Sequence, residues 1–394
     1  MAKQKSWLKF RHKMVYALAL PVFSIYVRLK YNAKIDRFRD KRPMLVLMNH
    51  QTGFDQFFPA ISFFRPLYFL ASEDIFSMGW VSDIIRWLAE PIPIKKQTTD
   101  IRAVKTCIRV AQDGGSICLA PEGNRTFHGK NVYTNPAIAG LAKKLGLPIA
   151  FYRIEGGYGV QPRWSDVVRK GKMHCYVSRV LEPEEFQQMS NEELYALILQ
   201  ELFVDEACLS GTYRHKKNAE FLERVVYFCP WCGLSEFESR EDVITCKKCR
   251  RQIRHLPTKQ LEGIGWEFPY EFVADWYDAQ NAFVRNLDPM TMIQEPVYED
   301  RAAYYLVTPY SHKDCLCPDA TVRLYGDRIT VNDRIFSFDT STVVILGKNK
   351  LNIYDGHEQL QLKGSKRFNG LKYLNFYHNY KNKTTQREID HLGI

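Results

Sequence analysis

Residues 44–71, MLVLMNHQTGFDQFFPAISFFRPLYFLA, decide the fold class of this chain. An apolar run at 44–48 is followed by polar residues, by a stretch of helical character at 55–64, and by a second apolar run at 67–71. Short apolar runs bounded by turn residues are typical of strands that are buried on both faces of a sheet. A strand, a helix and a second strand in this order predict a parallel βαβ unit.

The same alternation of apolar runs and helical stretches continues to about residue 190. Because helices that connect parallel strands cover the faces of the sheet, we predict an α/β domain with a mostly parallel sheet flanked by helices. The expected strands are 44–48, 67–71, 91–94, 116–120 and 147–154, and the expected helices are 55–64, 76–89, 100–112 and 136–145.

Two polar motifs begin where expected strands end. NHQTGFD (49–55) follows the strand at 44–48, and PEGNRT (121–126) follows the strand at 116–120. In parallel sheets, active sites gather beyond the carboxyl ends of the strands. The shared position of the two motifs therefore favours one common site.

His50 and Asp55 are the candidates for acid–base chemistry in the first motif. Histidine has a pKa suited to proton transfer at neutral pH, and a carboxylate can orient the imidazole and stabilise its charged form. Gly53 is expected to let the backbone turn back so that Asp55 reaches the ring. The alternative for His50 taken alone is a buried, hydrogen-bonded core histidine.

Glu122 and Arg125 are the candidates for binding in the second motif. The planar guanidinium of an arginine can hold a phosphate with two parallel hydrogen bonds, and a carboxylate can accept from a hydroxyl. The alternative is a Glu–Arg pair in a surface turn, which would have no function. Because both motifs follow the ends of expected strands, the binding role is favoured over a surface pair.

Together, His-x4-Asp and the later PEGxR resemble the glycerolipid acyltransferase family of the PlsC type, the 1-acyl-sn-glycerol-3-phosphate acyltransferases. The resemblance covers roughly residues 40–185, and the segments 71–96 and 147–154 are similar to the family's second and fourth motif blocks. It implies the glycerolipid acyltransferase fold. It also implies an O-acyltransferase of phospholipid biosynthesis that moves a fatty acyl chain from acyl-CoA or acyl-ACP to the free hydroxyl of lysophosphatidate, giving phosphatidate.

The resemblance also implies roles for individual residues. His50 would be the general base that takes the proton of the acceptor hydroxyl, Asp55 would orient it, and no acyl-enzyme would form. The residues that it places in the acceptor site are Glu122, Gly123, Arg125 and Lys96.

Three positions depart from the family pattern. Ser72 stands where a lysine is usual, Lys96 where an arginine is usual, and Asn124 where threonine or serine is usual. A lysine can neutralise a phosphate as a point charge but lacks the bidentate fork of arginine. Acyl transfer remains the interpretation, and a different lysolipid or lipid-like acceptor is an alternative to lysophosphatidate.

A cysteine-rich segment carries two CxxC pairs, Cys229/Cys232 and Cys246/Cys249. Two such pairs supply four thiolates to one tetrahedral metal ion, and four protein ligands leave no open position, so the ion would be structural. Gly233 is expected to allow the tight turn after the first pair. A rubredoxin-like iron would use the same ligands, but the spacing resembles a zinc ribbon. Redox-active dithiols are the alternative, which two pairs disfavour.

The N-terminal segment is apolar and flanked by basic residues. The run at 14–27 is short for a membrane span, contains Pro21, and is followed by a poor match to a signal-peptide cleavage site. A stripe of apolar residues and lysines on other faces favour a helix that lies in the membrane surface. The alternative is a helix packed on the domain's own core. The stripe comprises Trp7, Phe10, Met14 and Leu18.

Composition bounds the partners and the compartment. The 394 residues are 45% apolar and carry a formal net charge of +11, which favours an anionic partner such as a phosphate or an acidic lipid surface. Ten cysteines without the spacing of a secreted disulfide scaffold favour a reducing compartment. We therefore expect the protein at the cytoplasmic face of the cell membrane. No signature of a nucleic-acid-binding domain is present, so no nucleic acid is expected.

The tail from residue 301 consists of short alternating segments punctuated by glycine, aspartate and asparagine, and predicts an antiparallel β module closed by a helix at 367–382. This module loosely resembles PH or GRAM domains, which implies a lipid or partner contact; a β appendage with only a packing role is the alternative. The expected division is 1–35 membrane anchor, 36–190 acyltransferase domain, 191–225 helical linker, 226–256 zinc ribbon, 257–300 linker of uncertain structure, and 301–394 PH-like module.

The prediction is thus a membrane-associated acyltransferase with a structural Zn²⁺ ion, an acyl thioester donor and a lysophospholipid acceptor. The rival is a membrane-binding zinc protein with a degenerate acyltransferase domain. The intact set His50, Asp55, Glu122 and Arg125 favours the enzyme, because a binding module has no reason to keep these four residues as a group.

Overall fold

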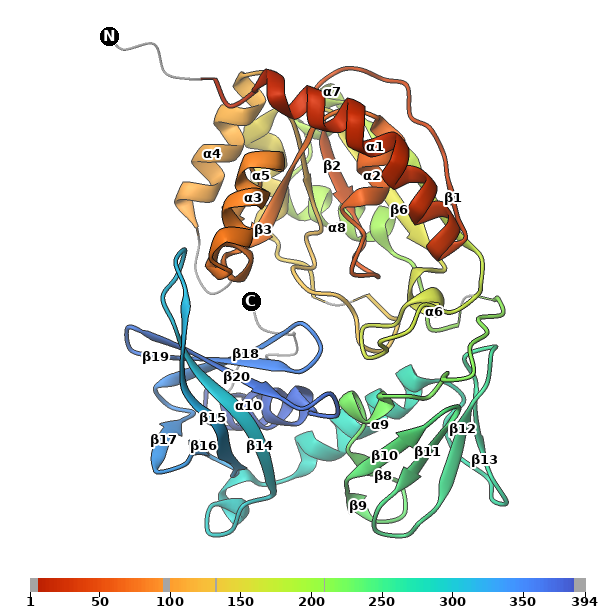
Figure 1. Ribbon diagram of the computed structural model, residues 1–394, viewed down its shortest axis with the longest axis vertical. Coiled ribbons are helices and arrows are strands. Elements are labelled where there is room, and N and C mark those ends of the chain that lie inside the picture. Colours follow the sequence, from red (N-terminus) through yellow and green to blue (C-terminus); the bar gives the residue numbers. More distant parts are fainter. Residues whose placement is uncertain (1–5, 95–99, 132, 209, 386–394) are drawn as a thin grey trace. The chain divides into compact units, whose positions relative to one another are not determined.

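The structure is a computed structural model that describes residues 6–94, 100–131, 133–208 and 210–385 (Figure 1). The chain divides into two compact units, which are described separately. Unit 1 comprises Met1–Thr126, Lys130–Gln161 and Lys170–Gly211, and unit 2 comprises Phe127–Gly129, Pro162–Arg169 and Thr212–Ile394.

Unit 1 is built on a seven-stranded sheet. Neighbouring strands are parallel except β6 and β7, which are antiparallel. This confirms the predicted α/β class with a mostly parallel sheet. The strand order is β1 (Ala33–Ile35), β7 (Met173–Leu181), β6 (Ile149–Glu155), β2 (Leu45–Met48), β5 (Ser116–Leu119), β3 (Leu67–Ser72) and β4 (Ile92–Ile94).

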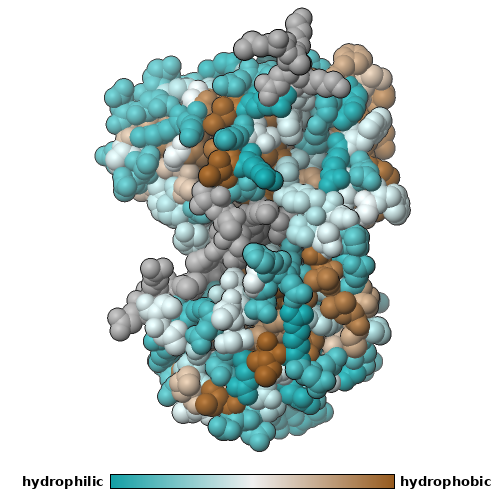
Figure 2. Space-filling view, turned by 90° about the vertical axis from the view of Figure 1, so that its left-hand side faces the viewer, coloured by the Kyte–Doolittle hydropathy of each residue, from teal (hydrophilic) through white to brown (hydrophobic). Residues whose placement is uncertain are grey.

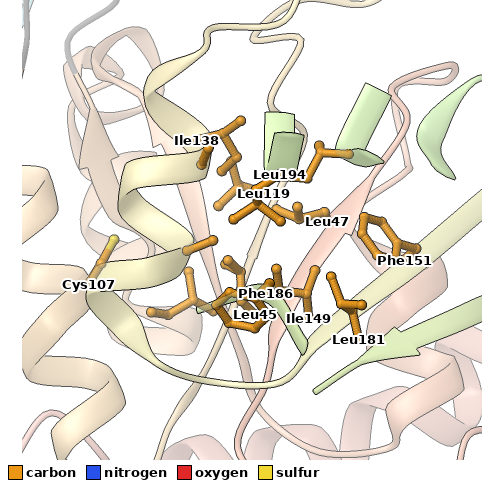
Figure 3. Close-up of a cluster of buried hydrophobic side chains, with 14 of the residues drawn as sticks. Leu45, Leu47, Cys107, Leu119, Ile138, Ile149, Phe151, Leu181, Phe186 and Leu194 are labelled. Atoms are coloured by element: carbon orange, nitrogen blue, oxygen red, sulfur yellow. The ribbon is translucent and has the colours of Figure 1, made fainter. Parts of the chain in front are cut away.

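Helices cover both faces of this sheet. On one face, α4 (Ile101–Gln112), α5 (Ala137–Leu145) and α8 (Asn191–Leu202) pack on Leu45, Leu47 and Phe151, which form a continuous apolar core (Figure 3). On the other face, Tyr152 meets Ser62 of α2 (Phe57–Phe63), their hydroxyl oxygens 2.9 Å apart. Adjacent strand residues thus point to opposite layers, as buried parallel strands require. Helix α1 (Phe10–Tyr31) packs beside α2 and β1.

The helix expected at 76–89 is interrupted. A short 3₁₀ turn, Glu73–Ser77, precedes α3 (Trp80–Ala89), and Gly79 joins them with φ +60° and ψ −135°. This backbone conformation suits only glycine, so the helix begins after it. By contrast, α4 begins where predicted, because the Asp100 side chain accepts from the Arg102 and Ala103 N–H groups at 3.0 Å.

The first part of unit 2 contains the cysteine-rich segment. A hairpin, β8 (Phe228–Cys229) and β9 (Gly233–Leu234), precedes a four-stranded sheet. That sheet consists of β10 (Phe237–Arg240), β11 (Val243–Cys246), β12 (Gln252–His255) and β13 (Leu261–Gly263) in order, all antiparallel. Helix α9 (Val273–Asn286) follows, in the stretch expected only as a linker of uncertain structure. The indole of its Trp276 donates to the Phe228 carbonyl at 2.7 Å.

The second part of unit 2 is the predicted antiparallel β module. Its seven strands are closed by α10 (Gly370–Thr385), which packs on β18 and α9. The closing helix begins three residues later than predicted. The sheet order is β17 (Arg334–Ser337), β16 (Arg328–Val331), β15 (Lys313–Leu324), β14 (Tyr298–Val307), β20 (Glu358–Gly364), β19 (Lys350–Asp355) and β18 (Ser341–Leu346).

Candidate functional site

His50 lies just beyond the carboxyl end of β2. The preceding Asn49 is buried and ties this end of the strand to β6: its Nδ2 donates to the Ile154 carbonyl at 2.9 Å, and its Oδ1 accepts from the Ile154 N–H at 2.8 Å. The imidazole is partly exposed, and its Nδ1 lies 2.7 Å from Oδ2 of Asp55. If Nδ1 donates its proton to this carboxylate, Nε2 is the basic nitrogen of the ring.

The Asp55 carboxylate is fully buried and is held by the loop that it closes. It accepts from the Gln51 N–H at 2.5 Å, from the Thr52 N–H at 2.8 Å and from the Thr52 hydroxyl at 2.6 Å. These donors fix the carboxylate independently of the imidazole. Gly53 is not among the glycines with left-handed backbone, so a positive φ is not what it contributes to this turn.

Glu122 follows β5, the parallel neighbour of β2, and is buried under the His50 loop. The backbone N–H of His50 donates to its carboxyl group, and Asn131 Nδ2 donates to Oε1 at 3.2 Å. Burial raises the pKa of Glu122 to about 8, and the Asp55 carboxylate adds to the increase. The two motifs are thus joined by a carboxyl group that favours its neutral form.

We expect Glu122→Gln to flatten the pH dependence of stability. The folded-state pKa of about 8 lies above the ordinary value of 4.5, so the unfolded chain releases this proton first as the pH rises. The wild type should therefore lose stability between these two values, whereas the glutamine variant lacks this loss. Melting temperatures of both proteins at constant ionic strength test this. Parallel curves across that range would contradict the raised pKa.

Arg125 lies beside two residues that the sequence did not reveal. A Cβ added to Gly53 would lie 3.7 Å from Nη1 of Arg125 and 3.9 Å from Oε1 of Gln161. Gln161 Oε1 accepts from the Tyr31 hydroxyl at 3.2 Å and from the Gly53 N–H at 3.4 Å. Burial lowers the pKa of Arg125, and the Asp55 carboxylate opposes this effect. Gln161 and Tyr31 lie in neither motif, so no sequence signal marked them.

The turn after β6 packs directly on the His50 loop. A Cβ on Gly157 would lie 2.8 Å from the Cβ of Gln51, so this close approach requires glycine. The buried Glu206 holds the turn by accepting from the Gly156 N–H at 2.6 Å and the Tyr158 N–H at 3.1 Å. The carboxyl ends of three adjacent strands, β5, β2 and β6, therefore form one polar site.

The other predicted binding residues differ in how they are placed. Gly123 is exposed, with φ +65°, whereas Asn124 is buried beside it. Ser72 ends β3, two strands from β2. Lys96 lies outside the described residues, so its part in the site stays a prediction.

The four cysteines of the two CxxC pairs come together in unit 2. The Sγ atoms of Cys229, Cys232, Cys246 and Cys249 lie within 4.8 Å of one another, and those of Cys229 and Cys249 are 3.8 Å apart. Four thiolates around a tetrahedral Zn²⁺ at about 2.3 Å are separated by about 3.8 Å. The cluster therefore fits a structural zinc ion, and these four residues would hold it.

Each CxxC pair forms a tight turn. Gly233, after the first pair, has φ +71°, as expected. Arg250 takes the same place after the second pair, with φ +63°, and its N–H donates to the Cys246 carbonyl at 3.0 Å. Left-handed backbone at both positions lets N–H groups turn toward the sulfur cluster.

Helix α1 packs on unit 1 with one face and exposes apolar side chains on the other. His12, Leu20, Val27 and Tyr31 are buried. By length and composition the helix could cross a membrane, a test that core helices and signal sequences also pass, and 17% of its apolar window is buried. Packing on the domain's own core thus describes one face of this helix, and the membrane contact of the exposed face stays a prediction. The exposed apolar residues are Phe10, Met14, Leu18, Val22, Ile25, Tyr26 and Leu29.

Comparison with known proteins finds a family and a solved structure that resemble part of this chain. The crystal structure of the 1-acyl-sn-glycerophosphate (LPA) acyltransferase PlsC from Thermotoga maritima is similar, with 21% sequence identity, a TM-score of 0.42, and coverage of 50% of this chain and 81% of that chain. No curated protein matches the chain significantly. Residues 30–154 match the family described as Acyltransferase and include both motifs, so the resemblance is confirmed. Residues 30–154 therefore form a domain of the acyltransferase family.

Proposed function

We propose that the protein transfers a fatty acyl chain from an acyl thioester, acyl-CoA or acyl-ACP, to the free hydroxyl of lysophosphatidate. The observation that carries this proposal is the distance of 2.7 Å between Nδ1 of His50 and Oδ2 of Asp55, at the carboxyl edge of the sheet. A hydroxyl needs a base in the transition state because its own pKa lies far above 7. The partly exposed imidazole can supply that base.

The proposed reaction has one acyl transfer step. His50 Nε2 takes the proton of the acceptor hydroxyl, and the oxygen attacks the carbonyl carbon of the thioester. The tetrahedral intermediate then breaks the carbon–sulfur bond, the ester remains on the acceptor, and the imidazolium returns its proton to the leaving thiolate. Asp55 holds the ring in place and stabilises its charged form, because the loop donors fix the carboxylate.

An anionic acceptor is supported by Arg125. Its guanidinium lies in front of Gly53, on the same loop as His50, and a phosphate there would accept bidentate hydrogen bonds. Burial lowers the pKa of Arg125 because it disfavours the charged guanidinium. A bound anion that pairs with the guanidinium would stabilise its charged form. Glu122, Gly123 and Lys96 are proposed to complete the acceptor site.

The acceptor is a membrane lipid, and we place the enzyme at the cytoplasmic face of the membrane. The exposed apolar side chains of α1 support this, as do its basic residues. The same helix contacts the catalytic loop: the rings of Tyr31 and Phe54 are 5.5 Å apart, and Lys30 Nζ lies 4.8 Å from the Phe54 ring centre. A helix at the lipid surface would therefore hold the catalytic loop close to its substrate.

A panel of acceptors tests the proposal. Purified protein in detergent with a labelled acyl donor should acylate lysophosphatidate, and Arg125→Gln should lower this rate by at least tenfold while affecting a neutral monoacylglycerol less. Arg102→Gln, an exposed arginine on α4, is the matched control and should behave as wild type. Transfer to another lysolipid instead would identify a different acceptor. A protein that is inert on every acceptor would favour the non-enzymatic rival.

A further inference from the structure

Helix α3 exposes large apolar side chains. Its only fully buried side chain is the polar Ser82, whose hydroxyl donates to the Ile75 carbonyl at 2.7 Å and accepts from the Met78 N–H at 2.8 Å. Its large apolar side chains point outward: Trp80 is 73% exposed and Trp87 is 56% exposed. A helix of a globular protein normally buries such residues, so their exposure indicates that this face of the helix binds another apolar surface.

The exposed residues of α3 form one stripe. Trp80, Ile84 and Trp87 are spaced by four and three residues, which places them on the same side of the helix, and Met78 is exposed just before it. Figure 2 shows one face of the molecule, on which separate hydrophobic patches lie among hydrophilic residues. We call Trp80, Ile84 and Trp87 the α3 stripe.

The α3 stripe lies next to the first turns of α1. The Arg11 guanidinium stacks on the Trp87 ring at 5.8 Å from its centre, and Arg11 Nη2 lies 3.4 Å from Glu90, directly after α3. Lys9 also pairs with Glu90. These contacts fix the end of α3 to the helix whose exposed apolar face supports membrane association.

The chemistry of these two helices favours a lipid surface as the occupant. Tryptophan prefers the boundary between headgroups and acyl chains, where its ring is in an apolar region and its N–H can bond. Helix α1 contains no acidic residue, and although Lys9 and Arg11 pair with Glu90, the exposed Lys13 beside them complements anionic headgroups. A binding site for a protein partner would not require the α3 stripe to lie beside the exposed apolar face of α1.

We propose that α3 inserts its stripe into the lipid interface beside α1, so that the acyltransferase unit meets the bilayer through two helices. The proposal rests on the membrane association given under the proposed function and adds a second contact to it.

Tryptophan quenching by brominated lipid tests the position of α3. Vesicles of phosphatidylglycerol and phosphatidylcholine with brominated acyl chains should quench wild-type fluorescence, and Trp80→Phe/Trp87→Phe should lose at least half of that quenching. Trp231, 62% exposed in the cysteine-rich segment, is the matched control, and Trp231→Phe should leave the quenching unchanged. If the double variant floats with the vesicles and is quenched like wild type, α3 is not in the interface.

Vesicle binding provides a second measurement. Trp80→Gln/Trp87→Gln should lower the partition coefficient at least tenfold, and Trp231→Gln should not. All three side chains are exposed, so melting temperatures should stay near wild type. If acrylamide fails to quench Trp80 and Trp87 without vesicles, another protein surface covers the stripe and the proposal is overturned. No readout uses a substrate, so a failure of the proposed acyl transfer would leave these results unaffected.

Discussion

Replacing His50 by alanine is expected to lower the rate of acyl transfer by about 10²–10⁴-fold, the usual contribution of a general base. Stability should change little. The Asp55 carboxylate keeps its hydrogen bonds from the Gln51 and Thr52 N–H groups and from the Thr52 hydroxyl, so the loop does not lose its anchor with the imidazole. Initial rates with a labelled acyl donor, together with melting temperatures, measure both effects.

The chain offers a matched control for this variant. His174 Nε2 also lies 2.7 Å from an aspartate, Oδ2 of Asp36, and the pair is in the same unit. It belongs to β7, which is separated from β2 by β6, and the imidazole is paired with Asp36 rather than with a residue of either motif, so His174→Ala should retain full activity. Wild-type rates for His50→Ala, or equal losses in both variants, would refute the assignment of His50 as the base.

Asp55→Asn tests whether the Asp55 carboxylate both orients the His50 imidazole and stabilises the loop. An asparagine presents one oxygen where the carboxylate presents two, so some of the loop donors lose their partner. Both the rate and the stability should therefore fall, unlike in His50→Ala, where only the rate falls. The difference follows from burial, since Asp55 is fully enclosed and His50 is not.

The sheet and the place of both motifs were predictable because they depend on local patterns. Short apolar runs identified β2, β3, β4, β5 and β6, and the rule for parallel sheets placed the motifs at one edge. The pairing of β2 with β5 and with β6 then brings the His50 loop beside Glu122 and Gly157. What the sequence could not give was the burial of Glu122, because PEGNRT alone also fits an exposed turn.

Tyr31 and Gln161 were missed for a physical reason. They approach Gly53 only because α1 and the turn after β6 pack on the same loop, and such long-range contacts leave no periodicity or spacing in the sequence. The exposure of the α3 stripe was missed for a similar reason. Its apolar residues predicted a helix correctly, but periodicity does not indicate whether the apolar stripe faces a core or an outside partner.

Replacing Cys249 by serine is expected to remove the metal ion from unit 2 and to unfold the cysteine-rich segment. Four thiolates at the distances observed form a complete tetrahedral set, and three leave the ion with an open position. For a module this small, metal binding contributes free energy on the order of 10 kcal/mol, which becomes folding free energy. Cys317→Ser is the matched control, since Cys317 is also a half-buried cysteine of unit 2 but lies outside the cluster.

Metal content and limited proteolysis measure this effect together. The wild type and Cys317→Ser should hold one equivalent of zinc and resist cleavage between β8 and β12, whereas Cys249→Ser should lack zinc and be cut there, because the hairpin and the small sheet have little apolar core of their own. A strong chelator should reproduce the variant in the wild type. Visible absorption would identify the bound ion as a rubredoxin-like iron on the same ligands instead of zinc. Full protease resistance of the metal-free protein would overturn a structural role for the cluster.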